Sequence, residues 1–272
     1  NFSIITNIFI LNLACSDLIF TITLPFWAVD HLHHWVFGDF VCKVITAGFA
    51  VGLYSSVILL TAMTVDRFTT VVLHNWPISH ARVKKCAIGA CIAAWVISIL
   101  ASLSDAMKVK VESSEEGKNY CEPESEDTLG HYLQVSLLFF LPLAIIIFCY
   151  SAILKTVLQG LNRRKFRTVA VLLCIVAAFF ICWGPYHIML LIKSLNTNND
   201  CKVLKRLAVA YHICEMLAYS HCCMNPLLYM LSQKLRKHLL SLLRCEKVNR
   251  KKRERSTSLN TSQQFTLQSS AI

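Results

Sequence analysis

Six long apolar runs constrain this chain more than any other feature of its sequence. A helix needs roughly 20 mostly apolar residues to cross a bilayer, and six stretches reach that length: 4–30, 39–73, 84–104, 130–158, 167–194 and 204–231. Hydrophobic residues make up 55% of the 272 residues and charged residues only 16%, whereas a soluble domain carries about 25% charge. The sequence therefore predicts an all-α membrane protein.

The charged residues predict how these spans lie across the membrane. The net charge is +11, and its Lys and Arg residues gather after the second span, after the fourth span and in the tail beyond residue 231. Short loops rich in Lys and Arg usually stay in the cytoplasm. The alternate loop 105–131 holds eight acidic and three basic side chains, but the loop 194–206 is an exception, with Lys202, Lys205 and Arg206. We therefore expect a multi-pass plasma-membrane protein with a cytoplasmic C-terminus, and we expect no nucleic-acid face, since the basic residues do not form one.

Charged side chains inside the spans indicate function, because burying a charge in a bilayer is costly. Asp17 lies in the middle of the first span. It is either a carboxyl held by hydrogen bonds to its neighbours or a site for a sodium ion. In the second interpretation Ser56 and Asn225 are the natural further ligands, provided that their helices face Asp17.

Two further charged sites lie in the second and last spans. Asp66 and Arg67 are adjacent, so they point in different helical directions and need not neutralise each other. They are either an interfacial arginine with its neighbour or an ionic latch released on activation. Glu215 lies in the last span with no obvious cation on the same helix. Its partner is either a basic group of a ligand or a histidine such as His187 or His212.

Several motifs resemble those of the rhodopsin-like (class A) G-protein-coupled receptors. They follow one another on separate spans: Asp17, Asp66-Arg67-Phe68, Trp95, Pro142 with Tyr150, Cys182-Trp183-Gly184-Pro185 and Asn225-Pro226-Leu227-Leu228-Tyr229. The match covers nearly the whole chain and starts at the second helix of that family. It implies a seven-transmembrane bundle that lacks its first helix and N-terminus here.

Shorter stretches narrow the resemblance to the chemokine receptors. They are TLPFW at 23–27, WVFG at 35–38 and SHCCMNP at 220–226. Within that family, GDFVCK at 38–43 and LYSS at 53–56 are most similar to the XC-type (lymphotactin) receptors. The resemblance implies a small basic chemokine, of the XC type, as the extracellular ligand and an inhibitory heterotrimeric G protein as the cytoplasmic partner, with chemotaxis and calcium signalling as the output.

The family resemblance also assigns roles to individual residues. It implies a disulfide between Cys42 and Cys121, and a pairing of Cys201 with a cysteine of the absent N-terminus. It implies a ligand pocket formed by Trp27, Phe49, Tyr186 and Glu215. It further implies an activation switch formed by Tyr150, Phe179, Trp183, Pro185, Pro226 and Tyr229, with Asp66 and Arg67 serving G-protein coupling. Phe68 and the stretch 69–72 depart from the family pattern.

The segment after the last span predicts two further regions. Leucines mixed with Lys and Arg over 232–245 predict an amphipathic helix on the membrane surface, ending at Cys245, which is either palmitoylated or a reduced thiol. Residues 246–272 are polar and rich in Ser and Thr, which is typical of a disordered cytoplasmic tail. Phosphorylation there by a receptor kinase would let the tail recruit an arrestin. The bundle itself would then cover 1–231.

Other classes of function receive less support. No nucleophile, base and orienting group appear together, so an enzyme is not expected. The histidines His31, His33 and His34 are better explained as an exposed polar loop than as a metal site, and no cofactor is expected apart from an allosteric sodium ion. A six-span transporter or channel remains an alternative, although no inverted repeat supports it. So does an atypical chemokine scavenger, against which the intact Asp66-Arg67 pair argues.

Overall fold

A computed structural model of the chain describes residues 2–73, 80–113, 117–123, 128–159, 163–195 and 201–222. Six helices carry the described fold: α1 (Phe2–Leu32), α2 (Gly38–Val71), α3 (His80–Met107), α4 (Thr128–Gln159), α5 (Arg163–Leu195) and α6 (Cys201–Tyr219). The first five confirm the predicted spans to within a few residues, and α6 confirms the start of the sixth. The predicted residues Asn225, Pro226 and Tyr229, the helix at 232–245 and the tail at 246–272 lie outside the described residues.

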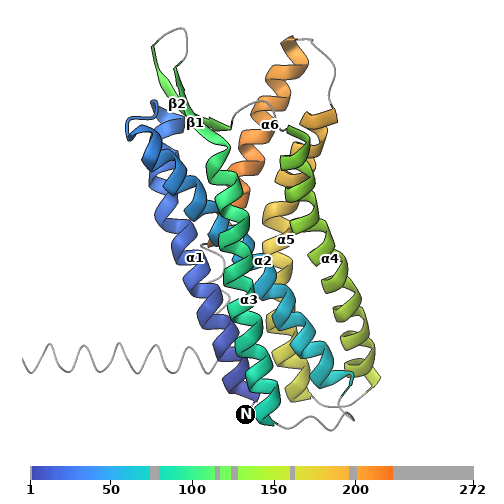
Figure 1. Ribbon diagram of the computed structural model, residues 1–272. Coiled ribbons are helices and arrows are strands. Elements are labelled where there is room, and N and C mark those ends of the chain that lie inside the picture. Colours follow the sequence, from blue (N-terminus) through green and yellow to red (C-terminus); the bar gives the residue numbers. More distant parts are fainter. Residues whose placement is uncertain are drawn as a thin grey trace, which may run out of the picture. The chain divides into compact units, whose positions relative to one another are not determined.

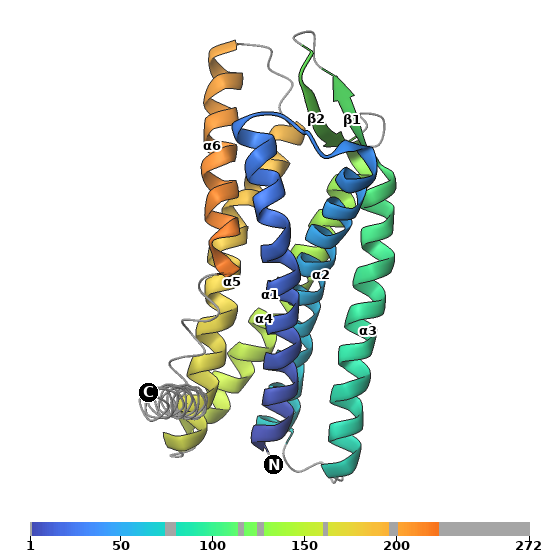
Figure 2. The ribbon, with the colours of Figure 1, turned by 90° about the vertical axis from the view of Figure 1, so that its left-hand side faces the viewer.

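The helices lie side by side and alternate in direction along the chain (Figures 1 and 2). The second helix, α2, is central, because it packs against α1, α3 and α4, while α5 packs against α4 and α6. Prolines lie inside α1, α4 and α5, at Pro25, Pro142 and Pro185. Neighbouring groups in a membrane bundle can satisfy the carbonyls that proline leaves without a donor, so such helices are tolerated there.

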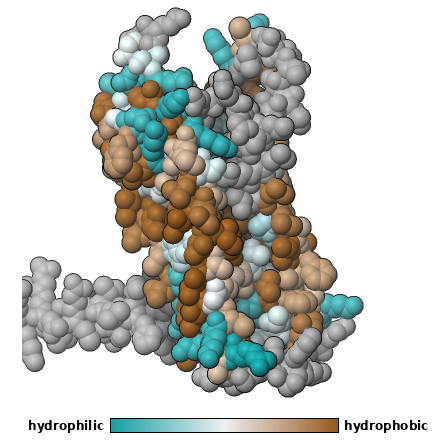
Figure 3. Space-filling model, viewed as in Figure 1, coloured by the Kyte–Doolittle hydropathy of each residue, from teal (hydrophilic) through white to brown (hydrophobic). Residues whose placement is uncertain are grey.

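The surface of the bundle is apolar around its middle. Large side chains such as Leu18, Ile92 and Phe148 are about 60% exposed or more, and hydrophobic residues cover the middle of the face shown in Figure 3, with hydrophilic ones toward both ends. The first five helices each contain a segment long and apolar enough to cross a membrane. The sixth predicted span, 204–231, begins in α6 and continues past the described residues.

Polar contacts inside the bundle connect α1, α2 and α3. The Trp95 indole of α3 donates a hydrogen bond to Asn12 Oδ1 of α1 at 2.9 Å. The Tyr54 hydroxyl of α2 donates one to Asp105 Oδ2 at 2.6 Å. Asp105 is therefore a buried residue of α3, and the prediction that it belongs to the acidic outer loop is wrong. The last turns of α3 extend past the predicted end of that span.

A two-stranded hairpin follows α3 and lies at one end of the bundle, which we call the hairpin end (Figure 1). Strands β1 (Val109–Ser113) and β2 (Asn119–Pro123) pair antiparallel, with Val111 opposite Cys121. The predicted disulfide between Cys42 and Cys121 is present and joins β2 to α2. These strands were not predicted from the sequence, so the helical bundle carries a small β element.

The link between α1 and α2 holds the hairpin in place. The backbone N–H of Trp35 donates to the carbonyl of Asn119 at 2.7 Å. Its indole N–H donates to the Gly38 carbonyl at 2.8 Å, where a positive φ of 81° suits glycine. The Trp35 ring is buried in a cluster with Ile45, Val109 and the disulfide. The hairpin is thus fixed against the ends of α1 and α2 by covalent, polar and apolar contacts together.

Candidate functional site

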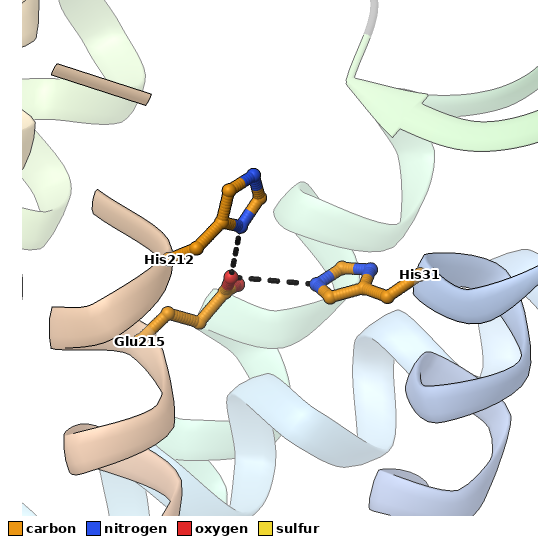
Figure 4. Close-up of side chains that lie close together, drawn as sticks. All are labelled: His31, His212 and Glu215. Atoms are coloured by element: carbon orange, nitrogen blue, oxygen red, sulfur yellow. Dashed lines mark hydrogen bonds and ion pairs between the residues drawn. The ribbon is translucent and has the colours of Figure 1, made fainter. Parts of the chain in front are cut away.

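Glu215 lies near the C-terminal end of α6 and is the centre of a polar cluster with the last turn of α1, toward the hairpin end of the bundle. Its side chain is buried and accepts a hydrogen bond from the Tyr219 hydroxyl at 2.8 Å through Oε1. Its other oxygen, Oε2, lies 3.3 Å from His31 Nε2 and 3.2 Å from His212 Nδ1 (Figure 4). The carboxylate therefore has three side-chain partners, from α1 and from α6 itself.

The sequence-based expectation for Glu215 was wrong on one point. The same helix does supply a partner, since His212 lies three residues earlier and residues at that spacing share a helix face. That spacing was a signal in the sequence. His187 has different neighbours, because its ring stacks on Phe139 of α4 with centroids 4.0 Å apart. The contact with His31 joins residues 184 positions apart, and only the folded arrangement reveals it.

The four predicted pocket residues are connected through aromatic rings. Phe49 of α2 contacts Trp27 of α1, with ring centroids 6.1 Å apart, and Tyr219 of α6 at 5.8 Å. Tyr219 in turn donates to Glu215. Tyr186 of α5 contacts Trp183 at 5.7 Å. The structure therefore brings residues of α1, α2, α5 and α6 to one region.

Two tyrosines of α6 extend this region and were missed by the sequence reasoning. Tyr219 contacts both Glu215 and Phe49. Tyr211 donates a hydrogen bond from its hydroxyl to the Tyr186 hydroxyl at 3.1 Å. Both lie four residues from Glu215 along α6, so helix periodicity could have placed them on its face.

Below this pocket, Trp183 lies at a junction of rings. It is fully buried and stacks on Phe179 with centroids 6.2 Å apart. It also contacts Phe49 at 6.3 Å and His221 at 5.5 Å. Pro185 lies two residues further along the same helix. The predicted switch residues of α5 therefore pack directly between the pocket and the middle of the bundle.

Asp17 lies next to His221 in the middle of the bundle. The distance from Asp17 Oδ1 to His221 Nε2 is 3.6 Å, and both side chains are buried. Ser56 is also buried, and its Oγ has no hydrogen-bond partner among the described residues. Asn225, the third predicted sodium ligand, lies outside the described residues. His221 was not predicted here, although it occurs in the SHCCMNP motif.

Asp66 and Arg67 lie toward the opposite end of α2 from the hairpin. Arg67 Nη2 is 2.8 Å from Asp66 Oδ2, and the Arg67 side chain is only 2% exposed. The two adjacent charges do pair, which the sequence left open. Tyr150 of α4 is buried as well, and α2 packs against α4. The remaining switch residues, Pro226 and Tyr229, are outside the described residues.

Comparisons with known proteins now identify the family. The family described as 7 transmembrane receptor (rhodopsin family) matches residues 2–229. Human chemokine XC receptor 1 is 42% identical over 250 residues, which cover 88% of this chain and 72% of the relative. The mouse chemokine XC receptor 1 is 38% identical, with 89% and 74% covered. C-C chemokine receptor type 3 of Cavia porcellus is 34% identical, with 88% and 70% covered. The chain is a rhodopsin-family chemokine receptor.

Membership in this family decides several earlier questions. The receptor is a multi-pass membrane protein, and the described helices form part of its seven-helix bundle. The family consists of receptors rather than enzymes, as predicted. The transporter or channel alternative is wrong, because the match extends over nearly the whole chain. The receptor spans 72% of the length of its human XC relative.

Proposed function

We propose that this receptor binds a small basic chemokine, of the XC type, outside the cell and activates an inhibitory G protein inside it. Chemotaxis and calcium signalling are the cellular output. One observation carries the proposal: a buried carboxylate, Glu215, lies at the hairpin end, and ring contacts connect its surroundings to Trp183 in the core. The XC receptors among its relatives support the ligand class.

The hairpin end is proposed to face outward. Disulfides form and persist in oxidising surroundings, and the Cys42–Cys121 bond lies at this end. The clusters of Lys and Arg that follow the second and fourth spans and fill the tail support a cytoplasmic position for the other end and for the C-terminus, whereas Lys202, Lys205 and Arg206 are an exception to this pattern. Exposed acidic side chains of the hairpin, Glu112 and Glu122, would attract the body of a basic chemokine and raise its association rate.

The N-terminus of the chemokine is then proposed to enter the pocket. Its amino group would pair with Glu215, displacing the imidazoles of His31 and His212 from the carboxylate. An ammonium group carries a full charge to the carboxylate, and hydrogen bonds in which the donor or the acceptor is ionised are roughly twice as strong as neutral ones. Trp27, Phe49 and Tyr186 would contact the apolar part of the same segment. Because Phe49 has no hydroxyl group, its own contact with the ligand would be purely apolar.

Activation requires a two-state element that the ligand can bias. We assign this role to α5, with Trp183 and Phe179 packed below the pocket and Pro185 interrupting its hydrogen-bond ladder. An outward swing of its cytoplasmic end would release Arg67 from Asp66. The resulting cleft, lined also by Tyr150, would accept the C-terminal helix of a G-protein α-subunit as an amphipathic helix in a groove.

A sodium ion and two tail-binding proteins complete the proposal. Asp17, Ser56 and Asn225 would hold the ion in the inactive state, and the buried Ser56 hydroxyl that lacks a partner among the described residues supports this. His221, 3.6 Å from Asp17, would compete with the ion for this carboxylate. A receptor kinase and an arrestin would bind the tail at 246–272.

The proposal is tested in cells that express the complete receptor chain. They are challenged with a panel of XC, CC and CXC chemokines, and both cAMP and chemokine uptake are measured. We expect an XC chemokine to lower cAMP at lower concentration than the other classes. Uptake of chemokine without any change in cAMP would instead indicate a scavenger. No response and no uptake across the whole panel would overturn the proposal.

A further inference from the structure

Three side chains, those of His31, His212 and Glu215, converge at the hairpin end. One hydrogen-bond donor would satisfy a carboxylate oxygen, but here two imidazoles approach the same one. His31 Nε2 and His212 Nδ1 both approach the same oxygen of Glu215, Oε2, at 3.3 and 3.2 Å (Figure 4). Their ligand atoms all lie within 4.8 Å of one another. Two imidazole nitrogens and one carboxylate oxygen form a donor set that binds zinc in proteins.

The spacing of these atoms fits one ion. Zinc binds imidazole nitrogen and carboxylate oxygen at about 2.0–2.2 Å in a tetrahedron, so neighbouring ligand atoms lie about 3.3 Å apart. The two nitrogen-to-oxygen distances already have this length. Only the two imidazole nitrogens would have to move closer to reach that spacing, and the His212 side chain, which is 60% exposed, has solvent on one side to make this adjustment.

The supporting shell and the access route also fit a metal. Helical metal sites use pairs of ligands at i and i+3, which is the spacing of His212 and Glu215. Tyr219 donates to the other carboxylate oxygen at 2.8 Å and so orients the ligand, as outer-shell partners of metal ligands do. His31 and His212 are both exposed, so an ion can enter from solvent and a fourth position stays open for water.

We propose that His31, His212 and Glu215 bind a single zinc ion at the hairpin end of the receptor. The metal joins the end of α1 to α6. It also occupies the carboxylate that, under the proposed function, pairs with the chemokine amino group, so zinc acts as an antagonist of ligand insertion. This last consequence rests on the proposed function, whereas zinc binding itself does not. The grouping differs from the loop histidines His31, His33 and His34 considered from the sequence.

The test measures zinc binding in the absence of chemokine. The complete receptor chain is purified into lipid nanodiscs, its accessible thiols are alkylated, and zinc is titrated against a chromophoric chelator. We expect His31→Ala and His212→Ala each to weaken zinc binding by at least about 10-fold, since loss of even an outer-shell partner costs that much. Magnesium should not compete, because it prefers an octahedral set of oxygen ligands.

Two matched variants separate a metal site from other effects. His33→Ala removes a neighbouring exposed histidine and should leave zinc affinity unchanged. His212→Asp keeps a zinc ligand that alkylation of thiols does not modify and should preserve part of the affinity. Unchanged affinity in both His31→Ala and His212→Ala, or an equal loss in His33→Ala, would overturn the zinc site. If zinc binds as expected but does not change chemokine potency, the pairing of Glu215 with the ligand amine is wrong and the metal site stands.

Discussion

At the scale of single residues, the receptor buries several charged side chains in helices that are otherwise apolar. Glu215, Asp17 and Arg67 are all buried, and each has a charged or titratable neighbour within 4 Å. Removing one partner from a buried pair leaves an uncompensated charge, which costs roughly 3–5 kcal/mol. We infer that these buried charges serve function by exchanging one partner for another when the receptor is activated. This inference leads to three predictions.

Glu215→Gln should weaken activation more than surface binding of the chemokine. The amide keeps the shape of the side chain and its acceptor for Tyr219 but loses the charge. A hydrogen bond to a charged group contributes about 1.5–3 kcal/mol, so chemokine potency in the cAMP assay should fall by about 10- to 150-fold. Tyr219→Phe, which keeps the carboxylate, is the control. Equal losses of potency and of surface binding would contradict a two-step mechanism.

Asp66→Asn should raise signalling in the absence of chemokine. The substitution removes the charge that lies 2.8 Å from Arg67, so the guanidinium no longer has that partner to hold it in the inactive state. Basal cAMP should fall below the level of wild-type receptor at equal surface expression. A basal cAMP level equal to that of the wild type would show that the pair is structural rather than a latch.

Asp17→Asn should remove any dependence of chemokine binding on sodium. In the wild-type receptor, replacing sodium by choline should raise affinity, because under the proposed function the ion holds the inactive state. The asparagine variant should bind chemokine equally in both salts, since the neutral amide attracts a cation far less. Radioligand binding in the two buffers checks this. A persistent sodium effect in the variant would place the ion elsewhere.

The sequence reveals buried charges more readily than their partners. Glu215 and Asp17 stand out because they interrupt apolar runs, and His212 lies at helical spacing from Glu215. His31 and His221 carry no such signal. Their contacts with Glu215 and Asp17 depend on how α1 and α6 are packed, and that packing joins residues far apart in the chain.

At the scale of elements, helices were predictable and the hairpin was not. A bilayer demands a minimum length of apolar helix, so composition alone marks α1 to α5. The strands 109–113 and 119–123 lie in a polar, acidic loop. Their pairing depends on the disulfide to α2 and on Trp35, which donates to Asn119. The family resemblance implied the disulfide, but no local pattern of residues predicts the contact with Trp35 or the strand pairing that goes with it.

Gly52→Ala should destabilise the packing of α1 on α2. An added Cβ at this position would lie 2.8 Å from the Phe20 Cβ and 2.9 Å from its backbone nitrogen, so one helix must shift. Overpacking of this kind typically costs about 1–3 kcal/mol. Gly89→Ala is the matched control, because nothing lies within 4 Å of its added Cβ. Thermal melting in nanodiscs should separate the two variants, and equal melting temperatures would refute the close contact.

At the scale of the whole receptor, the pocket and Arg67 are functionally linked only if ligands at both sites shift the same equilibrium between an inactive and an active state. The path available is one of packed rings, from Tyr219 through Phe49 and Trp183 to His221 beside Asp17. Packed side chains of this kind transmit a change when the element that they belong to has two arrangements. In this proposal that element is α5, which carries Trp183.

Linkage makes the last prediction quantitative. If the G protein and the chemokine favour the same state, each must raise the affinity of the other by the same factor, typically 5- to 150-fold. Nucleotide-free inhibitory G protein should therefore raise chemokine affinity in nanodiscs by a factor in that range. Arg67→Ala should reduce this factor to one and abolish cAMP signalling, while leaving chemokine affinity without G protein largely intact. If G protein raised the chemokine affinity of Arg67→Ala by the same factor as in the wild type, the two binding sites would be coupled without Arg67.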